Sequence, residues 1–136
     1  MGKNSTHVET TTGKAVLWAF AASLLIKIFI IDFMIADGNS MIPTIKPGAI
    51  LPVCKVSYGI RLPGSSIYLF NWKVPKKGDV VVFYTPLGEI AVKRCGESLT
   101  NGLFYAFGDN SSHSYDSRNY GPISKNQIIG RVLGIK

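Results

Sequence analysis

The longest apolar run in the sequence limits the fold more than any other feature. Residues Ala15–Ile31 read AVLWAFAASLLIKIFII, interrupted by the charge of Lys27. About 20 apolar residues cross the hydrocarbon core of a bilayer as a helix, and about 17 is near the lower limit. We therefore predict a transmembrane anchor at residues 14–31, after a polar, disordered tail at residues 1–13. A cleavable signal peptide and a buried helix of a soluble protein are the alternatives, although no small-x-small cleavage site follows the run.

Lys27 limits where a membrane helix can lie, because a cation in the middle of a bilayer costs about 3 kcal/mol or more. If the span runs roughly from Lys14 to Lys27, both lysines lie near its ends and can reach the interfaces. Residues 28–36 then lead, as an interfacial strand, into a folded domain at residues 32–136.

Short segments rich in valine, isoleucine and aromatic residues fill the rest of the chain, separated by turn signals such as Lys46-Pro47-Gly48 and Asn101-Gly102. The predicted strands are Ala49–Val56, Ile67–Trp72, Asp79–Thr85, Glu89–Cys95, Leu103–Phe107 and Ile128–Ile135. This spacing predicts hairpins, and hairpins predict a compact antiparallel β domain. The stretch Tyr68–Trp72 is interpreted as a core strand, with an interfacial aromatic patch as the alternative.

The net charge of +7 is compatible with nucleic acid, an anionic membrane surface or an acidic partner. Because the apolar residues are concentrated in a membrane-type segment, we expect membrane lipid as a partner and no nucleic acid. The oligomeric state is left open, with a monomer expected.

Metal and histidine chemistry have little support in the sequence. His7 lies in the tail and His113 in a polar loop, and neither has a second histidine or a cysteine at metal-ligand spacing. Phosphate-binding loops, HExxH and GxSxG are absent from the sequence, so no metal or cofactor is expected. A serine–histidine–aspartate triad would have to use His113, which is more typical of a solvated loop residue.

A serine can also be activated by a lysine that has lost its proton. Free lysine titrates near 10.4, so such a base needs a desolvated, largely apolar setting. Lys93 lies inside the predicted strand Glu89–Cys95, on one face with Ala91 and Cys95. It is either an edge-strand residue that prevents aggregation or a desolvated base, and the strand alone favours the first.

Four stretches, in order after the anchor, resemble motifs of the type I signal peptidases, membrane-anchored serine–lysine endopeptidases that remove signal peptides from exported proteins. They are GNSMIPT at Gly38–Thr44, KGDVVVF at Lys77–Phe83, VKR at Val92–Arg94 and GDNSSHSYDSRNYG at Gly108–Gly121. With the anchor, the resemblance covers residues from about 15 to 136. Each motif is weak alone, but four in order are specific.

The resemblance implies roles for individual residues. Ser40 would be the nucleophile, and its backbone N–H would stabilise the oxyanion. Lys93 would be the general base, and Ser114 would orient this lysine. Asp116 and Arg118 would form a supporting ion pair. Some family members have a second oxyanion donor, a serine two residues before the nucleophile, but this chain has Gly38 there.

The resemblance also implies a substrate and a location. The substrates would be secretory preproteins with small residues at the −1 and −3 positions, held in shallow pockets lined by residues such as Met41 and Ile42. The location would be the bacterial cytoplasmic membrane, crossed once, with the catalytic domain on the extracytoplasmic side. There a disulfide between Cys54 and Cys95 could persist, although free thiols are expected.

Two other functions remain open at this stage. One is a serine–lysine protease of related β fold, such as the self-cleaving repressor-type proteins. The other is a membrane-tethered β module that binds partners without catalysis.

Overall fold

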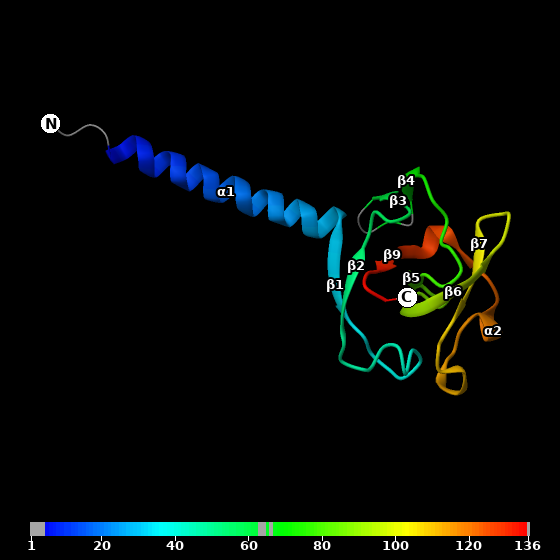
Figure 1. The fold of residues 1–136 in the computed structure, drawn as a ribbon. Helices are drawn as coiled ribbons and strands as arrows, with labels where there is room; N and C mark the ends of the chain where they lie inside the picture. Colours follow the sequence, from blue (N-terminus) through cyan, green and yellow to red (C-terminus); the bar gives the residue numbers. More distant parts are fainter. Residues whose placement is uncertain (1–4, 63–64, 66, 136) are drawn as a thin grey trace.

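The computed structural model describes residues 5–62, 65 and 67–135, and it consists of one long helix followed by a β domain (Figure 1). The helix is α1 (Ser5–Phe29). The strands are β1 (Ile31–Ile35), β2 (Ile50–Cys54), β3 (Gly59–Arg61), β4 (Tyr68–Asn71), β5 (Val80–Tyr84), β6 (Ile90–Ser98), β7 (Leu103–Phe107), β8 (Ile123–Ser124) and β9 (Ile128–Val132). Short helices η1 (Ser111–His113), α2 (Ser117–Tyr120) and η2 (Lys125–Gln127) lie in the connections near the C-terminus.

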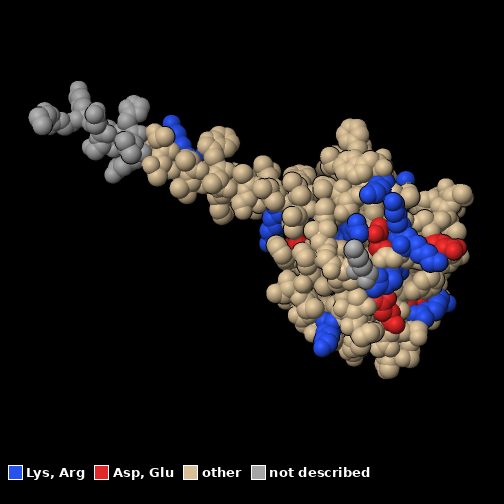
Figure 2. Space-filling model, viewed as in Figure 1, with Lys and Arg blue, Asp and Glu red and all other residues tan. Residues whose placement is uncertain are grey.

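Helix α1 projects away from the β domain (Figure 1). Residues Thr11–Phe29 are long and apolar enough to cross a membrane, and none of this segment is buried inside the protein. This exposure excludes the buried helix of a soluble protein and is consistent with a membrane anchor. In Figure 2, the part of the helix that is not drawn in grey is mostly free of charged side chains.

The start of α1 corrects one expectation. Residues 5–13 were predicted to belong to a disordered tail, but the helix begins at Ser5. Helix propagation adds one hydrogen bond for each residue fixed, and no proline stands before the apolar run to stop it.

The β domain is built on a seven-stranded sheet in the order β1-β2-β9-β5-β6-β7-β8, in which all neighbours are antiparallel. The sheet curls into a half-barrel, and a separate β3–β4 hairpin completes the domain. The predicted antiparallel β class is therefore confirmed, and each predicted strand overlaps an observed one, although β6 extends to Ser98, beyond the predicted end at Cys95. The last strand ends at Val132 rather than Ile135, where Gly134 turns the chain with φ of +79°. Strands β3 and β8 were not predicted.

The central strand β5 joins two hydrophobic clusters. Its alternating side chains point to opposite faces of the sheet, so Val80 and Val82 pack into one cluster while Val81 and Phe83 pack into the other. Phe83 also meets Phe104 of β7 edge to face, with ring centroids 6.0 Å apart. Each fully buried side chain of this size contributes about 1.5–3 kcal/mol, so these two clusters give β5 and β6 a rigid base.

The β3–β4 hairpin corrects a second expectation. The stretch Tyr68–Trp72 was interpreted as a core strand, but Leu69, Phe70 and Trp72 are 54%, 69% and 55% exposed. A two-stranded sheet can pack only one face against the domain, and here Tyr68 makes that contact by donating from its hydroxyl to the Ile128 carbonyl at 2.9 Å. The other side chains of β4 form an exposed apolar patch.

Candidate active site

The predicted nucleophile lies in a tight turn that follows β1. Gly38 starts this turn with φ of +79°, a left-handed conformation that favours glycine. Met41 and Ile45 are buried in the core below it, and the Ile45 N–H donates to the Met41 carbonyl at 2.8 Å. The turn is therefore fixed to the core on one side and presents half-buried Ser40 on the other.

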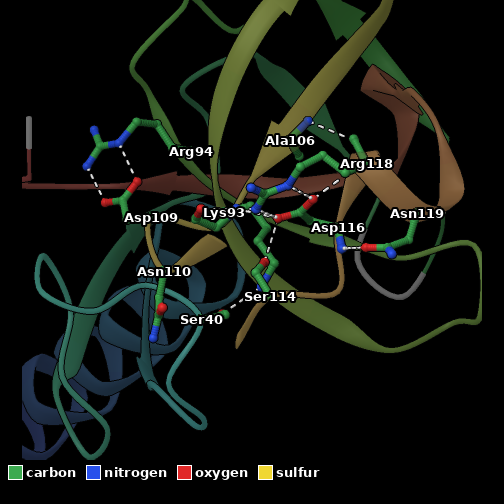
Figure 3. Close-up of polar contacts among 12 residues, drawn as sticks. Ser40, Lys93, Arg94, Ala106, Asp109, Asn110, Ser114, Asp116, Arg118 and Asn119 are labelled. Carbon is green, nitrogen blue, oxygen red and sulfur yellow. Dashed lines mark hydrogen bonds and ion pairs between the residues drawn. The ribbon is translucent and has the colours of Figure 1, made fainter. Parts of the chain in front are cut away.

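Lys93 reaches Ser40 from the middle of β6 (Figure 3). Its Nζ lies 2.6 Å from the Ser40 Oγ, although the two residues are 53 positions apart in the sequence. Only 5% of Lys93 is exposed. An edge-strand residue that prevents aggregation would keep its amine in water, so this burial favours the interpretation as a desolvated base.

Burial determines the protonation of Lys93. It disfavours the ammonium form and lowers the pKa of Lys93 from its ordinary value near 10.5. The carboxylate of Asp116 opposes this effect, and the guanidinium of Arg118 adds to it. The balance leaves an amine that is more easily neutral than an ordinary lysine, at hydrogen-bonding distance from a hydroxyl.

Asp116 is a fully buried carboxylate that organises the segment after β7 (Figure 3). Arg118 donates to both of its oxygens, from Nε at 2.9 Å and from Nη2 at 2.5 Å, and the Gly108 N–H donates at 2.8 Å. Burial acts to raise the pKa of Asp116, but the hydrogen bonds from Arg118, Gly108 and Ser114 outweigh it and hold the pKa below its ordinary value. The ion pair implied for Asp116 and Arg118 is present.

Ser114 differs from the expectation. Its hydroxyl donates to Asp116 Oδ2 at 2.5 Å, and it makes no hydrogen bond with Lys93 among the residues that the structure describes. The buried carboxylate is the stronger acceptor for the hydroxyl. Ser114 therefore contacts Asp116, and it is the charge of Asp116 that raises the pKa of Lys93.

A second ion pair, missed in the sequence analysis, holds the nucleophile turn from the other side (Figure 3). Arg94 donates to Asp109 Oδ1 from Nε and to Oδ2 from Nη2, both at 2.8 Å, and Thr44 donates its hydroxyl to Oδ2 at 2.5 Å. Next to Asp109, the Asn110 N–H donates to the Ser40 carbonyl at 2.9 Å. The loop after β7 is thereby attached to both ends of the turn.

The signal for this pair was present in the sequence. Asp109 lies in the motif Gly108–Gly121 and Arg94 lies in the motif Val92–Arg94, so both belong to stretches that resemble the family. Strand alternation separated Arg94 from Lys93, but alternation alone could not assign Asp109 as its partner.

A cleft of about 580 Å³ opens beside Ser40 and Lys93. One wall comes from β1 and the turn after it, and the other comes from the β5–β6 hairpin, including Ile90 and Val92. Met41 lines the cleft as predicted, whereas Ile42 is not part of its lining. Successive side chains in a tight turn diverge, so only one of these two neighbours faces the cleft.

The remaining candidates lie outside the cleft. His113 is exposed in η1 and its Nδ1 lies 3.0 Å from the Ser112 hydroxyl, whereas the amine of Lys93 is the group in contact with the Ser40 hydroxyl. Cys54 and Cys95 are free, as predicted. Within the described part of the chain, no group of three or more His, Cys, Asp or Glu side chains could hold a metal ion.

Comparison with known proteins gives the family. The sequence profile of the family described as "Signal peptidase, peptidase S26" matches residues 9–97 and 89–135. The chain belongs to this family. It is a signal peptidase, a serine endopeptidase that cleaves signal peptides from exported preproteins.

Individual relatives carry the same description. Signal peptidase I of Bacillus amyloliquefaciens is 29% identical, over 94% of this chain and 84% of the relative. Signal peptidase I T of Bacillus subtilis (strain 168) is 27% identical, over 94% of this chain and 85% of the relative. Signal peptidase I of Buchnera aphidicola subsp. Baizongia pistaciae is 40% identical over 54% of this chain, but that match spans only 26% of the relative. Near full-length similarity to the two Bacillus signal peptidases favours this family over the repressor-type and non-catalytic alternatives.

Proposed function

We propose that this signal peptidase works through a Ser40–Lys93 dyad, with Ser40 as nucleophile and Lys93 as the single general base. The observation that carries the proposal is the 2.6 Å separation between Nζ and Oγ in a site where Lys93 is buried and its pKa is lowered. A neutral amine at this distance can take the hydroxyl proton directly.

The reaction then follows in two stages. As the Ser40 Oγ attacks the scissile carbonyl, Lys93 takes the hydroxyl proton and then donates it to the leaving amine, which departs with the mature protein. Water next enters, Lys93 takes one of its protons, and the hydroxide attacks the acyl-enzyme. Return of that proton to the Ser40 Oγ releases the signal peptide as a carboxylic acid, which ionises by losing its proton to solvent, and restores both residues.

The Ser40 backbone N–H is the proposed oxyanion donor. Among the described residues it donates to no protein acceptor, so it is free to bind a developing oxyanion. Loss of one such donor costs about 3–4 kcal/mol in other hydrolases. The N–H of Gly38 is already directed to Asp37 Oδ1 at 2.8 Å.

The two walls of the cleft support an extended substrate. Strand β1 pairs only with β2 among the described strands, and β6 pairs with β7 only from Arg94 onward. The unpaired edges near Ala36 and Val92 therefore border the cleft on both sides. An extended peptide can hydrogen-bond with such edges, and apolar residues such as Met41 and Val92 line the cleft where the small −1 and −3 side chains that the family accepts would lie.

Placement at the membrane completes the proposal. We take α1 to span the bacterial cytoplasmic membrane once, with the β domain on its extracytoplasmic side and membrane lipid as a partner. Exposed Phe33 and Ile35 on β1 and Ile50 on β2 extend the apolar surface of the anchor onto the domain. Lys and Arg side chains gather on the face of the domain that Figure 2 shows, and the net charge of +7 suits anionic lipid. A signal peptide whose apolar segment lies in the bilayer would reach the cleft from that side.

Two variants of the full chain test the dyad. Ser40→Ala and Lys93→Met should each lose cleavage of a preprotein in lipid vesicles by a factor of about 10³ or more, while thermal unfolding remains cooperative. Exposed Lys46→Met serves as the control for loss of one positive charge. Normal processing by either dyad variant would reject the mechanism.

A further inference from the structure

A second cavity adjoins the catalytic cleft on the side where the anchor ends. It has a volume of about 270 Å³ and shares Met34 and Ile90 with the cleft. Its far wall includes Ile28 and Phe29 from the last turn of α1. The two cavities therefore lie next to each other between the end of α1 and Ser40, and we call the second one the upstream pocket.

Lys55 fixes the end of α1 beside this pocket. Its Nζ forms an ion pair with Asp32 Oδ2 at 2.8 Å and donates to the carbonyls of Ile28 and Lys27 at 3.3 and 3.4 Å. Its backbone N–H donates to the Ile30 carbonyl at 2.8 Å. A cation on the last carbonyls of a helix is favourable, since those groups have no partner within the helix. The upstream pocket is thus held at the level where the anchor leaves the apolar layer.

We propose that the upstream pocket binds the segment of the signal peptide between its membrane-embedded part and the residues in the catalytic cleft. This inference rests on the proposed function, because it uses Ser40 as the point of cleavage. The membrane-embedded part precedes the scissile bond in the substrate, so the substrate enters near Phe29 and runs toward Ser40. It therefore runs in the same direction as β1.

The length of β1 determines which substrate residues reach the pocket. At about 3.3 Å per residue, the five residues of Ile31–Ile35 cover about 17 Å, so the pocket receives residues about five to seven positions before the scissile bond. The length of β1 therefore fixes the number of substrate residues between the bilayer and Ser40. The number of residues between the membrane-embedded part of the substrate and the scissile bond is then a determinant of cleavage.

The charge of the pocket defines the side chains that it accepts. Lys55 is neutralised by Asp32. Arg61 has no ion pair among the described residues; its guanidinium lies 5.3 Å from the Tyr84 ring centre and donates to the Ile128 carbonyl at 3.0 Å. The pocket therefore has an apolar wall and one unneutralised positive charge. Apolar or acidic substrate residues suit it, and basic ones do not.

Leu62 provides a matched test, because it lines the pocket, is absent from the catalytic cleft and is 45% exposed. Leu62→Lys places a positive charge at its rim in the full chain, and Leu62→Glu places a negative charge there. The substrates are preproteins that differ only in one Lys or Glu, placed in turn at each position from about four to about twelve residues before the scissile bond. Cleavage is measured as kcat/KM in neutral lipid vesicles, and thermal unfolding verifies the fold of each variant.

The expected result is a charge preference that depends on position. Leu62→Lys should cleave the Glu substrates about two- to fivefold faster than the Lys substrates, and Leu62→Glu should show the reverse preference. The effect should be largest about five to seven residues before the bond and should fade in about 0.5 M salt. Val74→Lys and Val74→Glu, at an exposed residue outside both cavities, should show no such dependence.

Two outcomes would overturn the inference. One is a charge preference that is absent or equal at all positions. The other is a rate that follows the anionic lipid content of the vesicles regardless of substrate charge, which would assign the pocket to lipid headgroups. The Ser40→Ala variant separates this inference from the proposed function. If Ser40→Ala is inactive and either of these results is found, only the role of the upstream pocket is rejected. If Ser40→Ala cleaves normally, the Ser40–Lys93 dyad is rejected, independently of the Leu62 variants.

Discussion

Lys93 and Arg94 are neighbours on β6, yet they hold the nucleophile turn from two different sides. Lys93 meets the Ser40 hydroxyl, and Arg94 reaches the same turn through Asp109 and Thr44. Because β6 lies between β5 and β7, both side chains start from a rigid strand. The sheet therefore sets the distance between Lys93 Nζ and Ser40 Oγ, which leads to five predictions.

The pH dependence of cleavage should follow Lys93. Burial lowers the pKa of this lysine, and only its neutral form can act as base, so kcat/KM should rise with pH through a pKa below 10.5. The measurement is a pH–rate profile in vesicles. His113→Ala should leave the profile unchanged, and a displaced acid limb in that variant would assign the base to His113 instead.

Replacing the base should stabilise the fold. Since the folded-state pKa of Lys93 is lowered, its ammonium destabilises the native state fully at low pH, and this cost disappears as pH rises from the folded pKa toward 10.5. Lys93→Met should therefore unfold at a higher temperature than the parent protein, with the largest difference on the acid side. Calorimetry from neutral to alkaline pH tests this, and a difference that grows with pH would contradict it.

A methyl group at Gly108 should displace the nucleophile. A Cβ there would lie 2.6 Å from the Ser40 carbonyl oxygen and would also clash with Ser114. Displacement of a reacting group by about 1 Å can cost about 100-fold, so Gly108→Ala should lower kcat/KM by at least that factor. Gly96→Ala is the control, because its Cβ would meet only side-chain atoms of Phe107 and Tyr105. If both variants lose activity in proportion to stability alone, Gly108 has no positioning role.

The bidentate contact of Arg94 should matter more than its charge. Arg94→Lys keeps the charge but loses the paired hydrogen bonds to Asp109, so we expect kcat to fall by about tenfold while KM changes little. A double-mutant cycle with Asp109→Asn should give a coupling free energy of about 1–3 kcal/mol. Additive effects of the two substitutions would show that the contact does not position the turn.

Acid stability should depend on Asp116. Its folded-state pKa is lowered from 3.8, so its stabilising contribution is present above that value and is lost as pH falls below it. Asp116→Asn should cost about 3 kcal/mol at neutral pH, because it leaves buried donors without their charged acceptor. The difference between the variant and the parent protein should shrink progressively as pH falls below 3.8. Urea unfolding at several pH values measures this, and a constant difference would exclude the linkage.

The features that could be predicted from the sequence are those with a local signature in the chain. The apolar run, the period-two strands and the four motifs predicted an apolar N-terminal helix, the β class and two contacts that the structure contains, between Ser40 and Lys93 and between Asp116 and Arg118. Each of these depends on residues that are close in sequence or on a family resemblance.

The errors involve choices that tertiary packing makes. Whether β4 is buried depends on what covers it, and its composition suits a core strand and an exposed patch equally. The Ser114 hydroxyl had two possible partners, and the buried carboxylate of Asp116 is the one it contacts. The Arg94–Asp109 pair joins β6 to the loop after β7, and sequence spacing does not determine such pairs.

Only Ile30 separates the end of α1 from the start of β1. With α1 in a bilayer, so short a junction confines the catalytic turn to a thin layer at its surface. Enzyme and preprotein would then meet by lateral diffusion in two dimensions, and turnover would depend on how densely preproteins populate the membrane rather than on their bulk concentration.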